Sequence, residues 1–207
     1  MSSMSGASFA VLHALRLKGF ADTSVIAGVS RVAEVDVAER LRAAAEERLV
    51  AHRSGRVSGW TLTPAGRQRH RELVVEELDA AGVRAQIDAA YRGFLAVNGE
   101  LLEACTAWQV RNGAPNDHTD RAYDDAVVGR LAEIDDAVQP VCRELGSALS
   151  RFGDYGPRLA RARQRVESGE HDWFTRPMID SYHTVWFELH EDLLATLGIE
   201  RSREVSG

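Results

Sequence analysis

The sequence has little cysteine and almost no lysine. Cys105 and Cys142 are its only two cysteines, and each is set among apolar residues at helical spacing. No CxxC pair and no cluster of cysteine and histidine at metal-ligand spacing is present, which argues against a disulfide framework and a zinc site. We therefore expect two buried free thiols and no bound metal. Lys18 is the only lysine, so arginine carries nearly all of the positive charge.

Long apolar runs are also absent. No segment approaches the roughly 20 unbroken apolar residues that cross a membrane. The first apolar stretch is interrupted early by His13, Arg16 and Lys18, and no basic leader precedes it, so it does not have the pattern of a signal peptide. We expect a cytoplasmic protein without a membrane-spanning segment.

The motifs of common enzymes are missing as well. The chain has no glycine-rich phosphate loop and no GxSxG elbow, and His190-Glu191 begins like a zinc-protease helix but lacks the second histidine. The carboxylate pairs Asp124-Asp125 and Asp135-Asp136 are interpreted as solvated surface charge. The sequence thus predicts neither an enzyme nor a cofactor.

Charge is distributed unevenly along the chain. The total is −6, yet residues 1–75 contain 11 Arg and Lys against 7 Asp and Glu, whereas residues 76–207 contain 14 against 24. The first segment also contains His13, His52 and His70. A basic N-terminal part beside an acidic remainder is typical of a DNA-contacting domain joined to a body that phosphate repels.

Residues 1–75 have the pattern of three helices followed by a hairpin. Helices are predicted over Ser8–Gly19, over Ser24–Gly28 after a cap at Asp22 or Thr23, and from Glu34 to about Arg48. Three helices with a short link between the second and third form a helix-turn-helix core. We expect Val37, Leu41, Ala44 or Ala45, and Leu49 to face inward.

Two short β-type runs follow, Leu49–Arg53 and Trp60–Thr63, on either side of a segment bounded by glycines. This pattern predicts a β-hairpin wing. Thr63 then caps a new helix, with Pro64 at its first position, where the missing N–H costs nothing.

These residues resemble the MarR and PadR groups of winged-helix transcriptional regulators. The resemblance covers about residues 8–75 and is carried by Glu47-Arg48-Leu49-Val50, the wing glycines, and Leu62-Thr63-Pro64-Ala65-Gly66-Arg67. It implies that the third helix enters the major groove and that the wing approaches phosphates or the minor groove. The residues expected to contact double-stranded DNA are Ser30, Arg31, Arg40, Arg42, Arg53 and Arg56.

The third helix departs from a purely basic recognition helix. Its first two turns contain Glu34, Asp36 and Glu39 beside Arg40 and Arg42. Carboxylates near phosphate weaken binding, although they can accept a hydrogen bond from cytosine, and acidic residues are also favoured at a helix start by the helix dipole. The alternative function is therefore a winged helix that contacts protein or senses an effector and does not bind DNA.

Residues 76–207 are expected to form an all-helical dimerisation or effector domain. A long helix over Val83–Asn112 has a heptad seam of inward residues, and so does a helix from about Asp120 to Phe152, in which we expect a kink near Pro140. The two should pack antiparallel. Asn98, inside the first seam, either fixes register or dimer pairing or bonds to a neighbouring backbone. The predicted seams comprise Ile87, Tyr91, Phe94, Asn98, Leu101, Cys105 and Trp108, and Val127, Leu131, Ile134, Val138, Val141, Leu145, Ala148 and Phe152.

A shorter helix is predicted over Pro157–Glu167 and a last one over Thr175–Leu197. The main stripe of the last helix, which includes Met178 and Trp186, is predicted to be core. A second stripe on that helix mixes aromatic and ionisable groups and should meet a subunit interface, a small-molecule pocket, or a metal. It comprises Arg176, Asp180, His183, Phe187, His190 and Leu194, and the pocket would include Trp108, Tyr123 and Trp173.

The segment Trp173–Leu194 also resembles a helical tail of actinobacterial phosphoenolpyruvate-utilising proteins of the pyruvate phosphate dikinase kind. Neither a phosphohistidine nor a nucleotide-binding motif accompanies it, so the resemblance implies no phosphotransfer chemistry. It associates the alternative function, a module that does not bind DNA, with phosphoenolpyruvate and pyruvate metabolism.

The sequence as a whole predicts a mainly α protein, with an N-terminal winged helix-turn-helix and a helical bundle after it. The function we expect is that of a homodimeric transcription regulator, with basic domains on two DNA half-sites and a helical body that could respond to a small-molecule effector.

Overall fold

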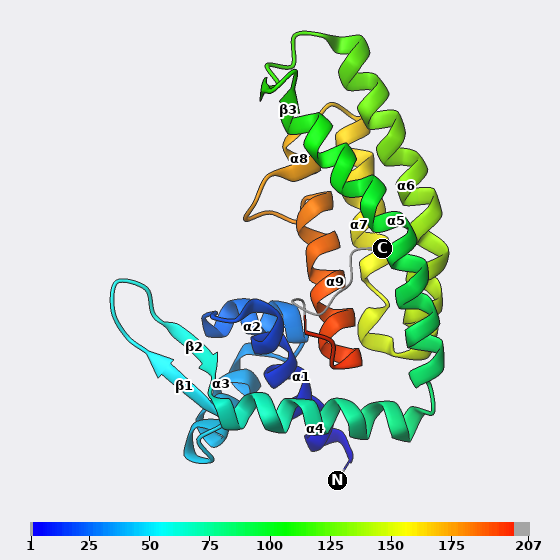
Figure 1. The fold of residues 1–207 in the computed structure, drawn as a ribbon. Helices are drawn as coiled ribbons and strands as arrows, with labels where there is room; N and C mark the ends of the chain where they lie inside the picture. The colour runs from blue at the N-terminus through cyan, green and yellow to red at the C-terminus, as the bar shows by residue number, and fades with distance from the viewer. Residues whose placement is uncertain (1, 201–207) are drawn as a thin grey trace. The chain divides into compact units, whose positions relative to one another are not determined.

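The computed structural model of the protein describes residues 2–200 and the side chains of residues 6–200, and it is mainly helical (Figure 1). The only strands among these residues form two short antiparallel hairpins. The predicted fold class is thereby confirmed at the level of a mainly α protein. The chain divides into two compact units, which we call the N-terminal unit (Met1–Ala80 with Leu194–Gly207) and the helical unit (Ala81–Leu193).

The N-terminal unit begins with three helices, close to where the sequence predicts them. They are α1 (Ser2–Lys18), α2 (Thr23–Ser30) and α3 (Glu34–Glu46). Asp22 caps α2, since its carboxylate accepts a hydrogen bond from the Val25 N–H at 2.9 Å, and α1 ends before Gly19, whose φ is +71°.

The predicted hairpin follows as β1 (Val50–Arg53) and β2 (Gly59–Leu62), paired antiparallel with Val50 opposite Leu62. The next helix, α4 (Pro64–Ala81), starts as expected, because the Thr63 hydroxyl oxygen accepts a hydrogen bond from the Gly66 N–H at 3.0 Å. The predicted domain boundary at 75–76 lies inside α4.

Apolar residues of α1, α2, α3, β1 and β2, together with Ala21 of the α1–α2 link, form one buried core cluster of the N-terminal unit. Val37 and Leu41 of α3 are both 0% exposed, which confirms the inward face predicted for that helix. This cluster comprises Val11, Leu12, Ala14, Leu15, Ala21, Ile26, Val37, Leu41, Val50 and Leu62.

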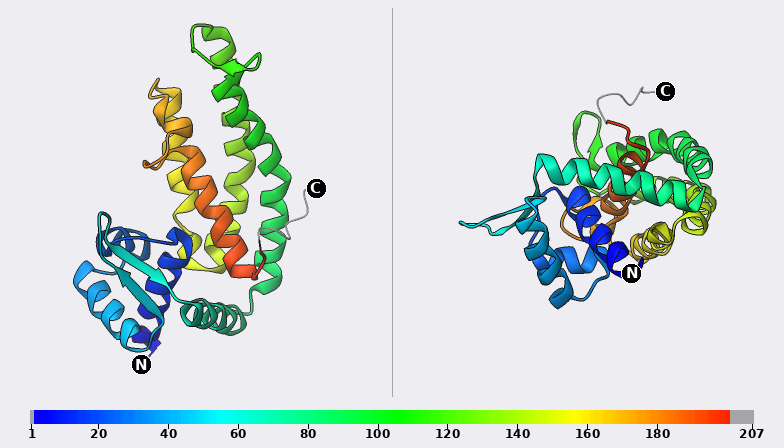
Figure 2. Two further views of the ribbon diagram at one scale, coloured as in Figure 1. Left: turned by 60° about the vertical axis from the view of Figure 1, so that its left-hand side comes forward. Right: turned by 90° about the horizontal axis from the view of Figure 1, so that it is seen from below.

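The helical unit is built on a long antiparallel pair, α5 (Arg84–Gln109) and α6 (Arg121–Ala148), which lie side by side in both views of Figure 2. Six of the seven seam residues predicted for α5 are buried, and Asn98 is half-buried. Most of the α6 seam is also buried, with Cys142 and Leu149 in place of Val141 and Ala148. The kink expected at Pro140 stays a prediction.

The prediction that residues 76–207 are all-helical is wrong at one hairpin. Between α5 and α6 the chain forms β3 (Val110–Arg111) and β4 (Ala114–Pro115). The turn residues Asn112 and Gly113 both have positive φ, at +52° and +78°. Asn-Gly is the dipeptide that favours such a two-residue hairpin turn, so the signal was present in the sequence.

The rest of the helical unit consists of a 3₁₀ turn η1 (Ser150–Phe152), α7 (Tyr155–Glu167), α8 (Asp172–Thr175) and α9 (Tyr182–Leu197). The prediction of one helix over Thr175–Leu197 is wrong, because the chain leaves the helical conformation between α8 and α9. Met178 has φ +68° and is 96% exposed, so it is not part of the core. Ser181 starts α9 by accepting a hydrogen bond from the Thr184 N–H on its hydroxyl.

Candidate functional site

The β1–β2 hairpin has a fixed base. Backbone hydrogen bonds join Ala21 and Trp60 in both directions, at 3.1 and 2.8 Å, so the α1–α2 link pairs with β2. Gly59 lies so close to this link that an added Cβ would come within 2.9 Å of the Ala21 carbonyl oxygen. The hairpin is therefore anchored to the helices where it emerges from them.

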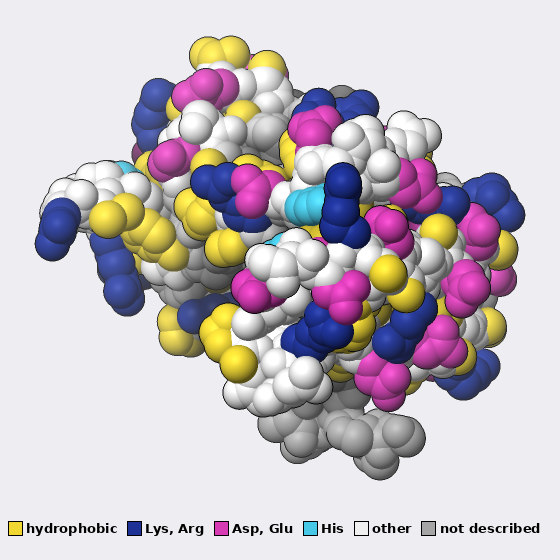
Figure 3. Space-filling view, turned by 90° about the horizontal axis from the view of Figure 1, so that it is seen from above, with side chains coloured by type: hydrophobic (Ala, Val, Ile, Leu, Met, Phe, Trp, Pro, Cys, Tyr) yellow, Lys and Arg dark blue, Asp and Glu magenta, His cyan; other side chains and the backbone are white. Residues whose placement is uncertain are grey.

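The outer end of the hairpin is solvent-exposed and basic. All residues from 51 to 58 are exposed, including Arg53 at the end of β1 and Arg56 in the turn. Basic side chains stand at the end of the projecting hairpin, at the left of Figure 3. The tip thus presents two cations to whatever approaches it.

Arg40 and Arg42, the two arginines of α3 predicted to contact DNA, have different environments. The Arg40 guanidinium donates a hydrogen bond to the Ser8 hydroxyl of α1 at 3.0 Å, whereas Arg42 is exposed. The residues beside Arg42 on the exposed side of the helix are Val35, Glu39 and Glu46. The outward face of α3 is therefore acidic on balance.

Ser30 and Arg31 lie at the end of α2, before the short link to α3. Arg31 caps α2 in the left-handed conformation, with φ +56°, and its N–H donates to the Ala27 carbonyl oxygen. Its side chain is exposed, while that of Ser30 is half-buried and accepts a hydrogen bond from the Val32 N–H. This link lets the chain turn sharply between the two helices.

Two of the three histidines in the basic segment of residues 1–75 are buried. His13 and His70 are 6% and 1% exposed, and His13 Nδ1 lies 2.9 Å from His70 Nε2. One of these two nitrogens must carry the shared proton. The pair lies in the interior, and of the three histidines in residues 1–75 only His52 is exposed.

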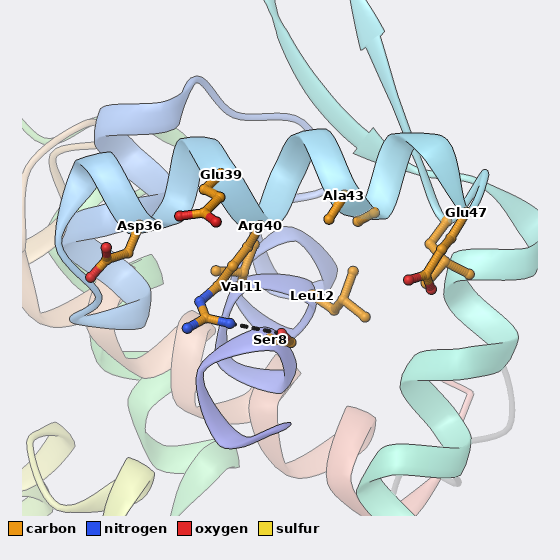
Figure 4. Close-up of a pocket in the computed structure, with 10 residues that line it drawn as sticks. Ser8, Val11, Leu12, Asp36, Glu39, Arg40, Ala43 and Glu47 are labelled. Carbon is orange, nitrogen blue, oxygen red and sulfur yellow. Dashed lines mark hydrogen bonds between the residues drawn. The ribbon is translucent and has the colours of Figure 1, made fainter. Parts of the chain in front are cut away.

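A cavity of about 420 Å³ opens between α1 and α3 (Figure 4). Its apolar surface comes from both helices and from Leu49, and its polar residues come mainly from α3. The lining residues are Ser8, Val11, Leu12, Asp36, Glu39, Arg40, Ala43, Ala44, Glu47 and Leu49. No sequence pattern pointed to this cavity.

The aromatic residues predicted to line a pocket in the helical unit each have their own partners. Trp108 is buried, with the Phe174 ring 5.0 Å away and the His118 ring 4.5 Å away. The Tyr123 hydroxyl donates to the Ala107 carbonyl oxygen at 3.0 Å. The Arg165 guanidinium lies over the ring of Trp173. Packing and hydrogen bonding within the chain are thus sufficient to explain why these aromatic side chains are present.

The second stripe predicted on the last helix is broken, because Arg176 and Asp180 precede α9. Arg176 pairs with Asp172, and Asp180 accepts two hydrogen bonds from Arg158 of α7, at 3.1 and 3.0 Å. The interruption that separates them from His183 contains Pro177, which limits helical hydrogen bonding there.

The four stripe residues that do lie on α9 have different environments. Leu194 is buried, at 1% exposed. His183 is half-buried, and burial lowers its pKa. His190 is 7% exposed, with its ring centroid 5.1 Å from that of Phe94. Phe187 is 47% exposed, which makes it the apolar side chain of this stripe that faces solvent.

One carboxylate of each acidic pair is buried, so the interpretation of both pairs as surface charge is wrong. Asp124 is 6% exposed and is held by Asn116 at 2.9 Å and His118 at 3.0 Å. Asp135 is 3% exposed and accepts a hydrogen bond from the Tyr182 hydroxyl at 3.2 Å. Asp124 lies three residues before Val127 and continues the spacing of the α6 seam, whereas Asp135 lies beside the seam residue Ile134, so the heptad pattern did not indicate its burial.

The two cysteines are buried free thiols, as predicted. Burial raises the pKa of both Cys105 and Cys142 to about 12. In the part of the chain that the structure describes, no cluster of three or more histidine, cysteine or acidic side chains could hold a metal ion.

No helix within residues 2–200 combines the length and the apolar character needed to cross a membrane. Comparison of the chain with protein-family models, with curated proteins and with solved structures found no match.

Proposed function

We propose that the N-terminal unit is a winged helix-turn-helix that binds double-stranded DNA, with the β1–β2 hairpin as its wing. The observation that carries this proposal is the exposed tip with Arg53 and Arg56, supported by a base that is bonded to the α1–α2 link. A projection with an anchored base and two cations at its outer end suits contact with the phosphate backbone or the minor groove.

The order of the elements supports the same proposal. The sharp turn at Arg31 between α2 and α3, followed by a hairpin and α4, is the order in which a helix-turn-helix with a wing is built. In this arrangement α3 enters the major groove, and Arg42 on its exposed side is the cation that reaches it.

The charges of α3 decide how such a protein would recognise DNA. Because Arg40 bonds to Ser8 and the exposed side of α3 includes Glu39 and Glu46, the helix adds little favourable charge. Most of the affinity would then come from the wing, through contacts with phosphates that do not depend on base sequence.

The salt dependence of DNA binding tests this proposal. We expect Arg56→Ala to weaken binding to all duplexes by a similar factor and to reduce the slope of log K against log[salt] by about 0.9, the loss of one phosphate contact. Fluorescence anisotropy with duplexes from the protein's own promoter region and with an unrelated duplex measures both quantities.

Arg92→Ala in the helical unit is the matched control, since Arg92 is also an exposed arginine. It should leave the slope unchanged. The assigned role of Arg56 would be contradicted if Arg56→Ala kept the salt slope of the wild-type protein. It would also be contradicted if the variant lost affinity only for duplexes that differ at one base position.

A second candidate function is protein binding through α3. It is favoured by the outward face of that helix, where Val35 is 75% exposed between acidic residues. A wild-type protein that shows no salt-dependent binding to any duplex would favour this candidate over DNA binding.

We also propose that the chain acts as a homodimer, because a single short winged helix covers only one DNA half-site. The exposed aromatic ring of Phe187 in the helical unit supports a contact between subunits.

A further inference from the structure

The cavity between α1 and α3 has a consistent division between apolar and charged surfaces. Val11 and Leu12 of α1 form its apolar wall together with Leu49, and the small side chains of Ala43 and Ala44 on α3 leave the space open. Its volume of about 420 Å³ is within the range of small-molecule sites.

Three carboxylates belong to the same lining. Asp36, Glu39 and Glu47 all come from α3 or its C-terminal end, and Figure 4 shows them along the length of the opening. The one cation of the lining is Arg40, whose guanidinium is bonded to Ser8. Three negative groups against one positive group give the cavity a net negative charge, which favours a cationic occupant.

The arrangement of the carboxylates favours an organic cation over a metal ion. Among the described residues no three such groups come together in a way that could hold a metal. Because carboxylates of α3 and apolar side chains of α1 belong to the same lining, an occupant satisfies both surfaces only if it combines an apolar body with a positive end.

We propose that this cavity binds a small organic cation of that kind, an ammonium group attached to an aromatic or branched aliphatic body. The apolar body packs against Val11, Leu12 and Ala43, and the ammonium group pairs with the carboxylates of Asp36 and Glu39. This ligand site goes beyond DNA binding, and its existence does not depend on the proposed function.

Isothermal titration calorimetry of the full chain with three probes of similar shape tests the proposal. The probes are 2-phenylethylammonium, the neutral 2-phenylethanol and the anionic 3-phenylpropanoate. We expect the ammonium to bind roughly tenfold more tightly than the alcohol, the effect of one charge-assisted contact, and the carboxylate to bind not at all.

Two variants locate the site. Ala43→Leu fills the cavity from an exposed position of α3 and should abolish binding of the ammonium and the alcohol alike. Glu39→Gln should weaken binding of the ammonium roughly threefold or more and leave the affinity for the alcohol unchanged. Glu46→Gln, on the same helix but outside the lining, is the control and should change neither.

Thermal melting of each variant establishes that it is folded before its affinity is compared. Equal affinity for the ammonium and the alcohol, absence of binding by the ammonium, or undiminished binding to a folded Ala43→Leu protein would each overturn the proposal. Since no DNA is present in these titrations, their result is separate from that of the wing experiment.

Discussion

Asn98 shows how a polar residue inside a heptad seam finds its partner. Its side-chain oxygen accepts a hydrogen bond from the Trp186 indole N–H at 2.9 Å, across 88 residues of sequence. The partner is a side chain on another helix and not a neighbouring backbone group, which was one of the two alternatives open from the sequence. The bond joins α5 to α9 inside the helical unit, and a role of Asn98 in register or dimer pairing stays a prediction.

A double-mutant cycle measures this bond. Asn98→Ala leaves the indole N–H of Trp186 without its acceptor, and we expect it to lower the free energy of unfolding by about 1 to 3 kcal/mol. In the Trp186→Phe background the same change should cost less, with a coupling energy of about 0.5 kcal/mol or more. Urea denaturation of the four proteins gives these values, and strict additivity would show that the bond contributes nothing.

The Thr63–Gly66 segment determines how the hairpin meets α4. The Thr63 hydroxyl donates to the Arg48 carbonyl oxygen at 2.7 Å and accepts from the Gly66 N–H. Gly66 lies so close to the preceding chain that a Cβ would be 1.9 Å from the Leu49 carbonyl oxygen. The glycine of the motif Leu62–Arg67, which carries the family resemblance, is therefore explained by the close approach of the α4 backbone to Leu49, where only glycine fits.

Gly66→Ala should consequently be strongly destabilising. The methyl group forces α4 and the start of β1 apart, and we expect a loss of about 2 to 3 kcal/mol in the free energy of unfolding. Gly28→Ala is the matched control, because Gly28 is also helical and an added Cβ meets nothing within 4 Å. That variant should gain about 0.4 to 1 kcal/mol. Urea denaturation followed by circular dichroism compares them, and similar stabilities would refute the steric account.

The association state is a property of the whole molecule. Sedimentation at micromolar concentration should give twice the mass of one chain, and Phe187→Asp should shift it toward the mass of a monomer, since a charge in an apolar contact is costly. Met178→Asp is the control, because Met178 is 96% exposed outside the stripe. A wild-type protein that sediments as a monomer, or a dimer insensitive to Phe187→Asp, would contradict the expected interface.

The sequence by itself determined most of the helices, the first hairpin and the seam of α5. These features depend on residues that are close in sequence. A cap at Asp22 and the Thr63-Pro64 start place the ends of helices, and apolar residues at helical spacing place one face of a helix in the core. The same locality explains why the helix boundaries agree to within a few residues for α2 and α3.

Only the tertiary structure decided where polar side chains and open space lie. Arg40 forms a hydrogen bond with Ser8, His13 with His70, and Asp135 with Tyr182. In each case the partner lies far away in the sequence. The cavity likewise depends on how two helices approach each other across small alanines. Hydrogen bonding and packing at such sites are set by distances in space, and a single sequence records only the order of its residues.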